Sequence, residues 1–163
     1  MSQHIFNLKA QEPFRLDLTV WGLRRRANNV MDRWVDNTWR RALTVENHTV
    51  EVVVSQSAED HSNIQVQVIG PNLIDRQIKL LSIALEKCLG LSKNLSAYYE
   101  FAQKDKILNK LTQRFLGLKP PRFPTVFEAV VNGIACQQLS LDVGITLLNR
   151  LSENYGRKAM LTK

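Results

Sequence analysis

The period of the apolar residues changes along this chain after Gly70, from two to three or four. Before that point apolar and polar residues alternate, most clearly over residues 50–54 and 64–68, and such alternation is typical of strands with one buried face. Beyond residue 92 the apolar residues recur every three or four positions, which indicates helices only. The sequence therefore predicts an α+β protein with two domains, residues 1–92 and 93–163.

The first part is predicted to form a short antiparallel sheet covered by one helix. Strands are expected over residues 14–21, over 34–45 with a turn at Asp36-Asn37, and at the two alternating segments. Asn72 is expected to cap the covering helix and Gly90 to end it in a left-handed conformation. The apolar residues expected to cover the sheet lie on one face of this helix: Ile74, Ile78, Leu81, Leu85 and Cys88.

The second part is predicted to contain four helices. Two short ones are expected over residues 95–103 and 104–116, and a third is expected to begin with Pro124 in its first turn. Ser140 is expected to cap the fourth, which ends at Gly156. Gly144 is expected to allow this helix a close approach to a neighbour. The apolar rows of the last two helices have few partners in the remaining sequence, and these rows are Phe127, Val130, Val131 and Ile134, then Leu141, Ile145, Leu148 and Leu151. Residues 157–163 show no pattern.

Composition places the chain among globular proteins and excludes several classes. Of its 163 residues 44% are hydrophobic and 23% charged, which argues against a disordered or low-complexity protein. No apolar run approaches the roughly eighteen residues of a membrane helix, and no basic segment precedes an apolar one at the N-terminus. We therefore expect a cytoplasmic protein, in which Cys88 and Cys136 are free thiols rather than a disulfide.

Positive charge is concentrated in two stretches. The chain has 22 Lys and Arg against 15 Asp and Glu, a net charge of +7. Seven arginines and three aspartates lie in residues 15–41, and six basic residues with one aspartate lie in residues 104–122. Each stretch is equally well interpreted as a solvated surface or as a set of phosphate contacts.

No active site can be identified from residue patterns alone. The three histidines, His4, His48 and His61, are scattered without metal-ligand spacing, so no metal site is predicted. There is no glycine-rich phosphate loop and no nucleophile motif. Four carboxylates that could attract attention are assigned ordinary roles on a strand surface, in a turn, at a helix cap and on a helix surface: Asp17, Asp32, Asp75 and Glu128.

The most distinctive motif is Gln137-Gln138-Leu139-Ser140, at the joint between the last two expected helices. Amide side chains can hydrogen-bond to base edges and can fill a gap in a base stack. They can also satisfy free backbone groups at a helix end. The residues themselves leave both interpretations open.

Two segments resemble the helix-hairpin-helix DNA glycosylase superfamily, in particular its alkyladenine branch, the 3-methyladenine glycosylases. The helical part is similar to the opening helices of that superfamily over residues 123–140 (FPTVFEAVVNGIACQQLS) and 151–156 (LSENYG). The first part is similar to the N-terminal domain of the branch at residues 16–26 (LDLTVWGLRRR), 32–34 (DRW) and 38–43 (TWRRAL).

The resemblance implies an N-terminal antiparallel domain like half of a TATA-binding protein, followed by the first helices of an all-α glycosylase domain. Such enzymes flip a damaged base out of double-stranded DNA and hydrolyse its glycosidic bond without a metal or organic cofactor. It implies that Gln137 lies near the flipped nucleotide, that Gln138 enters the gap in the stack, and that Ser140 belongs to the same DNA-binding motif. Trp21 is a candidate for the lesion pocket, and an ordinary buried or interdomain tryptophan is the alternative.

The chain departs from the family pattern in one respect. The family's DNA-gripping hairpin and the aspartate that catalyses hydrolysis belong well downstream of the Gln-Gln motif, and the printed chain stops 25 residues after Gln138. We therefore expect an N-terminal portion of a glycosylase with no catalytic residue of its own. A non-catalytic nucleic-acid-binding module and a structural interaction domain are the alternatives.

Overall fold

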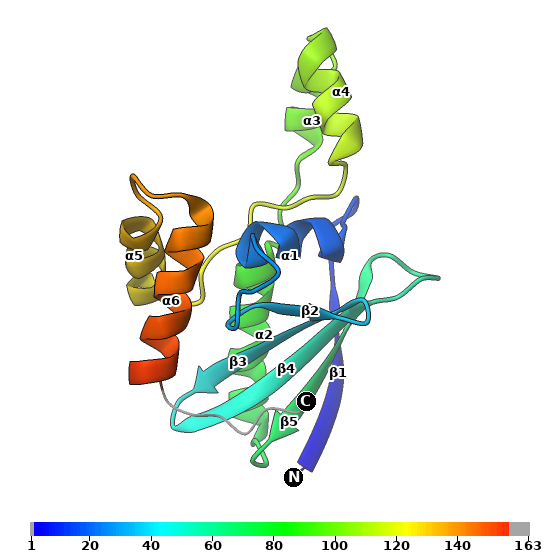
Figure 1. Cartoon of the computed structure of the whole chain (residues 1–163). Coiled ribbons are helices and arrows are strands. Elements are labelled where there is room, and N and C mark those ends of the chain that lie inside the picture. The colour runs from blue at the N-terminus through cyan, green and yellow to red at the C-terminus, as the bar shows by residue number, and fades with distance from the viewer. Residues whose placement is uncertain (1, 157–163) are drawn as a thin grey trace.

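The computed structural model describes residues 2–156 of the chain. Its first part is a five-stranded antiparallel sheet in the order β1-β5-β4-β3-β2 (Figure 1). The strands are β1 (Ser2–Lys9), β2 (Arg33–Val35), β3 (Thr38–Val45), β4 (His48–Gln56) and β5 (Asn63–Gly70). The predicted turn between β2 and β3 is confirmed, with positive φ at Asp36 and Asn37, as a tight hairpin turn requires.

The alternating residues of β3, β4 and β5 place one face of the sheet in the core. Val54 pairs with Trp39 on one side and Val66 on the other, and all three side chains are fully buried. Strand β1, which pairs with β5 from Ser2 to Lys9, was not predicted from the sequence. Its inward residues Phe6 and Leu8 are only partly buried, because β1 is an edge strand.

The strand expected over residues 14–21 is wrong, because Leu16–Arg24 forms helix α1. Leu16, Leu18 and Val20 alternate with polar residues. However, Leu16, Val20 and Leu23 recur at the helical spacings of four and three. The helical spacing buries all three against the sheet core. Asp17 in the first turn and Arg24 in the last turn also suit the helix dipole.

Helix α2 (Asp75–Leu89) lies behind the sheet and covers its apolar face (Figure 1). Leu81, Leu85 and Cys88 are buried there as predicted, and Gly90 ends the helix in the left-handed conformation. The expected Asn72 cap is wrong, since Ile74 precedes the first helical residue and is 63% exposed. The Gln77 side chain instead accepts a hydrogen bond from the Ile74 amide at 3.1 Å.

Helices α3 (Ser96–Ala102) and α4 (Lys106–Arg114) form a hairpin that projects beyond α1, away from the sheet (Figure 1). The chain then returns to the sheet region, meaning the sheet with α1 and α2. Gly117 accepts a hydrogen bond from the Arg15 amide at 2.8 Å, and the Lys119 amide donates to Thr19 Oγ1 at 3.1 Å. The Arg122 amide donates to the Cys88 carbonyl at 2.9 Å, so residues 117–122 line the sheet region.

Helices α5 (Val126–Ala135) and α6 (Leu141–Tyr155) form an antiparallel pair beside the sheet region (Figure 1). Thr125 caps α5 through its side chain. The expectation that Pro124 lies in the first turn is therefore wrong, because the first helical residue is Val126, two positions later. Ser140 caps α6 as predicted. Of the row predicted for α6, Ile145 is buried, whereas Leu151 is 39% exposed.

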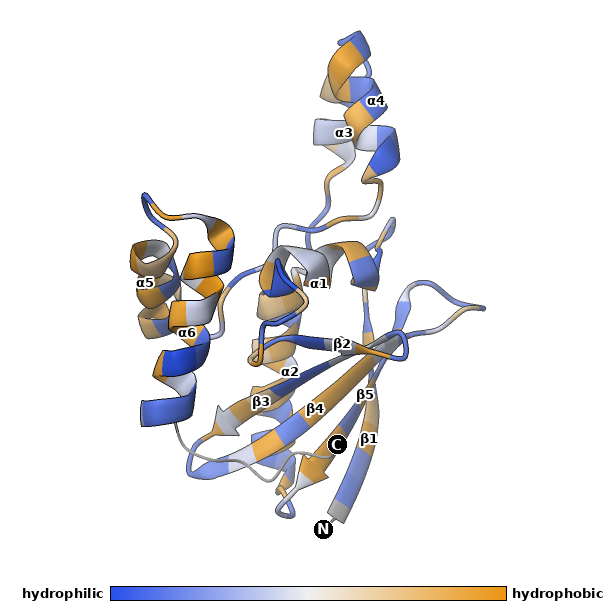
Figure 2. Ribbon diagram, viewed as in Figure 1, coloured by the Kyte–Doolittle hydropathy of each residue, from blue (hydrophilic) through white to orange (hydrophobic). Residues whose placement is uncertain are grey.

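Apolar side chains remain exposed on α4, α5 and α6, where apolar segments recur along the ribbon (Figure 2). On α5 the exposed residues include Phe127, Val130 and Ile134. These residues belong to the row that was predicted to have few partners, and their exposure agrees with that expectation. The tail that showed no pattern, residues 157–163, lies outside the described residues.

The two cysteines are free and differ in burial. Burial raises the pKa of the Cys88 thiol to about 12, whereas Cys136 is half-buried. Because the thiolate is the reactive form, a thiol reagent at pH 8 should modify Cys136 in the native chain and Cys88 only after unfolding. Mass spectrometry of partly labelled protein checks this, and equal native labelling of both thiols would contradict the buried position of Cys88.

Candidate functional site

The Gln-Gln motif occupies the turn between α5 and α6, here called the Gln loop (residues 136–140). Gln137 and Gln138 are both exposed, and Gln138 has φ of +57°. Non-glycine residues rarely adopt this conformation, and where they do the surrounding structure maintains it. Within residues 2–156 neither glutamine side chain makes a hydrogen bond to the protein, so both amides face solvent.

The Gln loop is held from both sides by the helices that flank it. The backbone amide of Gln137 donates to the Ile134 carbonyl at 3.2 Å. Ser140 Oγ accepts a hydrogen bond from the backbone amide of Val143 at 3.3 Å. Gly144 then lets α6 approach closely, because a Cβ there would lie 2.8 Å from both the Ala135 carbonyl oxygen and Cys136 Sγ. The predicted close approach at Gly144 is confirmed.

Gly144→Ala should therefore destabilise the chain by about 1–3 kcal/mol, because the added methyl group meets backbone rather than a flexible side chain. Gly133→Ala on α5 is the matched control, since a Cβ there meets nothing within 4 Å. That change should stabilise the chain by about 0.5–1 kcal/mol through helix propensity. Urea denaturation measures both, and equal effects of the two substitutions would show that the close approach is not needed.

Trp21, the candidate for the lesion pocket, lies on α1 with 60% of its surface exposed. It lines a hollow with Trp34, Asp17 and Arg24, all from the sheet region. A buried tryptophan does not fit this exposure, whereas the other form of the alternative, an interdomain tryptophan, stays open. No residue of the Gln loop lines the hollow, so the structure does not bring Trp21 and the glutamines into one described pocket, and stacking on a base stays a prediction.

A buried ion cluster joins the sheet region to α5, and the sequence analysis missed it. Arg41 on β3 is 2% exposed and donates to Asp32 Oδ1 at 2.7 Å and to Glu128 on α5. The Trp39 indole also donates to Asp32 Oδ1, at 3.0 Å. Burial alone would lower the pKa of Arg41, but the two carboxylates raise it above its ordinary value, so the arginine stays charged.

This cluster corrects the ordinary roles assigned to Asp32 and Glu128 as turn and helix-surface residues. Asp32 is 2% exposed, and Glu128 reaches across to the sheet region. The sequence did contain a signal. Arg41 stands between Trp39 and Leu43 at an inward position of an alternating strand, which places a charge in the core and requires a buried partner.

The arginines of residues 15–41 are mostly engaged with protein groups rather than free for phosphate. Ion pairs join Arg15 to Asp17, Arg26 to Asp142 and Arg33 to Glu51 at 2.5–2.6 Å. The second basic stretch differs, because four of its residues are exposed on the α3–α4 hairpin and form no ion pair within residues 2–156: Lys104, Lys106, Lys110 and Arg114. Of the two basic stretches, the one on the α3–α4 hairpin is thus better placed for phosphate contacts.

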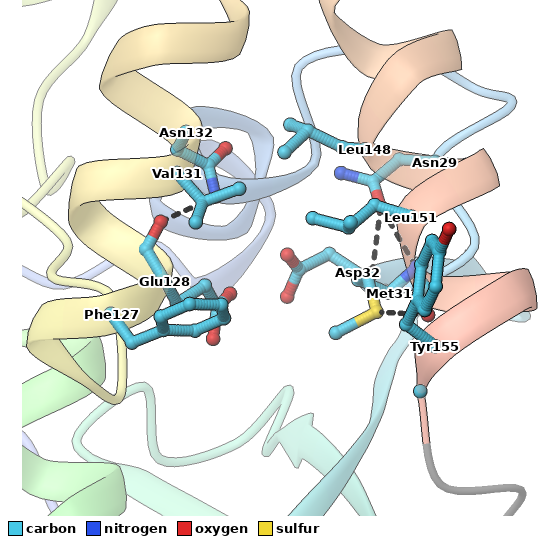
Figure 3. Close-up of a pocket in the computed structure, with 12 residues that line it drawn as sticks. Asn29, Met31, Asp32, Phe127, Glu128, Val131, Asn132, Leu148, Leu151 and Tyr155 are labelled. Atoms are coloured by element: carbon cyan, nitrogen blue, oxygen red, sulfur yellow. Dashed lines mark hydrogen bonds between the residues drawn. The ribbon is translucent and has the colours of Figure 1, made fainter.

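A cavity of about 250 Å³ lies between the loop at residues 29–32 and the helices α5 and α6 (Figure 3). Met31 and Asp32 point into it from the sheet region, opposite Phe127 of α5 and Leu148 of α6. It is lined by the first turns of α5 and the last turns of α6, so it lies at the opposite end of the helix pair from the Gln loop. The cavity and the Gln loop are separate features.

The described residues were also searched for a metal site and for a membrane-spanning helix. Within residues 2–156 no cluster of three or more His, Cys, Asp or Glu is arranged to hold a metal ion. Over the same residues, none of the helices combines the length and the apolar character that crossing a bilayer demands.

The chain is similar to known proteins both in sequence and in structure. No family model matches the chain. DNA-3-methyladenine glycosylase of Bacillus subtilis (strain 168) is 24% identical over 147 residues, which cover 89% of this chain and 48% of that protein. The solved 3-methyladenine DNA glycosylase of Archaeoglobus fulgidus has a TM-score of 0.79 and 23% identity, over 96% of this chain and 53% of that one.

The chain therefore resembles 3-methyladenine DNA glycosylases in sequence and in fold, which confirms the resemblance predicted from its motifs. The α+β fold class is confirmed as well. The chain spans about half the length of each of these relatives.

Proposed function

We propose that this chain is the N-terminal part of a DNA repair glycosylase that flips alkylated bases out of double-stranded DNA and excises them by hydrolysis. In this proposal residues 1–92 form an antiparallel domain and residues 93–163 begin the helical glycosylase domain. The Gln loop supports the proposal most directly. It presents two unpaired side-chain amides on a strained turn between two helices. The family that the chain resembles uses this motif to contact DNA.

The proposed roles follow from the chemistry of the side chains. Gln138 enters the gap that the extruded nucleotide leaves, and Gln137 lies beside that nucleotide, as amides can pair with base edges. Ser140 fixes the loop through its cap on Val143. Trp21 offers an exposed indole face on which an electron-poor alkylated base can stack.

A direct test is the binding of the chain to three labelled DNAs, followed by fluorescence anisotropy. These are an intact duplex, the same duplex with a stable abasic-site analogue, and the single strand. The proposal expects the abasic duplex to bind most tightly, because the cost of unpairing and unstacking a base, a few kcal/mol, is absent there. Equal affinity for both duplexes would instead favour a non-catalytic nucleic-acid-binding module.

Base excision is expected to require residues outside this chain. Hydrolysis needs a carboxylate that faces the developing sugar cation. The carboxylate that follows the Gln loop, Asp142, is 68% exposed and paired with Arg26. Incubation of the chain with methylated duplex DNA should release no base above a protein-free control, and release above that control would assign the chemistry to a carboxylate within the chain.

A further inference from the structure

Arg25 connects the sheet region to the helix that leads into the Gln loop. It follows the last residue of α1, where its amide donates to the Trp21 carbonyl at 2.8 Å. Its guanidinium donates to Asn132 Oδ1 on α5 and lies 3.4 Å from Cys136 Sγ. The same guanidinium stacks over the Phe123 ring, 5.8 Å from the ring centroid, so one side chain contacts residues before, within and after α5.

The contacts of Arg25 are specific, and its acceptor on α5 is buried, whereas Arg25 itself, Phe123 and Cys136 are half-buried. Asn132 is 8% exposed, and its Nδ2 donates to the Glu128 carbonyl at 3.0 Å, which orients the amide with its oxygen toward Arg25. Arginine is suited to this position because its planar fork can donate to two acceptors while its face stacks on a ring. A lysine could satisfy only part of this arrangement.

The position of Cys136 matters because Gln137 and Gln138 follow it directly. Arg25 contacts Cys136 Sγ, and Gly144 of α6 packs closely against the same residue. Arg25 and Gln138 both have positive φ, +56° and +57°. Such conformations persist only where neighbouring contacts enforce them. The Arg25 contact with Cys136 Sγ reaches this turn from the sheet region, and the Arg26–Asp142 ion pair joins the same region to the start of α6.

We infer that Arg25 is a positioning residue for Gln138: it anchors the end of α5 so that the Gln loop keeps the conformation in which Gln138 can enter a base stack. This inference rests on the proposed function for its DNA consequence, but the anchoring itself can be measured without DNA. It also gives the sheet region a role in DNA probing that requires no phosphate contact from it.

The first experiment measures the order of the Gln loop in the DNA-free chain by ¹⁵N relaxation. In the unchanged chain the amides of residues 136–140 should have order parameters of about 0.85, and in Arg25→Gln they should fall below about 0.6. Arg25→Lys keeps the charge without the fork and should lose order as well. Arg76→Gln, which removes an equal charge from an exposed pair with Glu46, should leave the loop unchanged.

The second experiment repeats the anisotropy titration with the abasic and intact duplexes. Arg25→Gln should lose roughly tenfold of the preference for the abasic duplex, and Arg76→Gln should keep that preference. A loop that stays ordered in Arg25→Gln, or an Arg25→Lys variant that behaves as the unchanged chain does, overturns the inference. If the unchanged chain shows no preference for the abasic duplex, the proposed function fails, and the relaxation data alone decide whether Arg25 positions the loop.

Discussion

Arg41→Met should lower the free energy of unfolding by about 3–5 kcal/mol, the cost of leaving a buried charge without its partner. Methionine preserves much of the side-chain volume but removes both donors. Asp32 would then keep only the Trp39 indole on a carboxylate that is 2% exposed. Chemical denaturation at pH 7 measures the loss, with circular dichroism as the signal.

Two variants separate the parts of this effect. Arg76→Met removes an arginine whose pair with Glu46 is largely exposed, so its cost should stay within about 1 kcal/mol. Glu128→Gln removes only the charge that α5 contributes and should cost less than Arg41→Met, because Asp32 keeps its arginine. If Arg41→Met costs no more than Arg76→Met, water reaches the cluster and it does not join α5 to the sheet region.

The Arg41 cluster illustrates what the sequence could and could not predict. The alternation over Trp39, Arg41 and Leu43 was sufficient to place Arg41 on the inward face of β3. Its partners were not predictable in the same way, because Glu128 is 87 positions away and no local pattern links it to β3. Burial of a charge could be inferred locally, whereas the identity of the opposite charge depends on tertiary structure.

Helix α1 shows a different limit of local patterns. Leu16, Leu18 and Val20 satisfy a period of two, whereas Leu16, Val20 and Leu23 satisfy a helical spacing. Short apolar segments are ambiguous between these two periods. Packing against the core favours the helical period, because the helix buries Leu16, Val20 and Leu23 together while Leu18 stays only partly buried.

The Gln loop was the part of the candidate site that could be predicted best. The cap at Ser140 and the close approach at Gly144 are local signals, and both appear in the structure. The contacts of Arg25 with Asn132 and Cys136 were not predictable, because they connect residues more than a hundred positions apart. The sequence therefore predicted the position of the loop but not the anchor that holds it.

Gln138→Ala should reduce the preference of the chain for abasic over intact duplex by roughly tenfold or more, because filling the gap in the stack offsets part of an unstacking cost of a few kcal/mol. The substitution removes the side-chain amide but leaves the backbone strain unchanged, because alanine and glutamine are both disfavoured at a φ of +57°. The melting temperature should therefore stay nearly constant, and binding to single-stranded DNA should change little.

Gln138→Gly completes this test, because glycine also lacks the amide but accepts a positive φ without strain. It should match Gln138→Ala in DNA preference while being equally stable or up to about 1 kcal/mol more stable. A side chain that only caps a helix end would give the reverse pattern, in which both variants lose stability and folded protein keeps its preference for the abasic duplex. Because the two interpretations of Gln138 predict opposite changes in stability and in binding, the pair of variants distinguishes a residue that probes DNA from one that supports the fold.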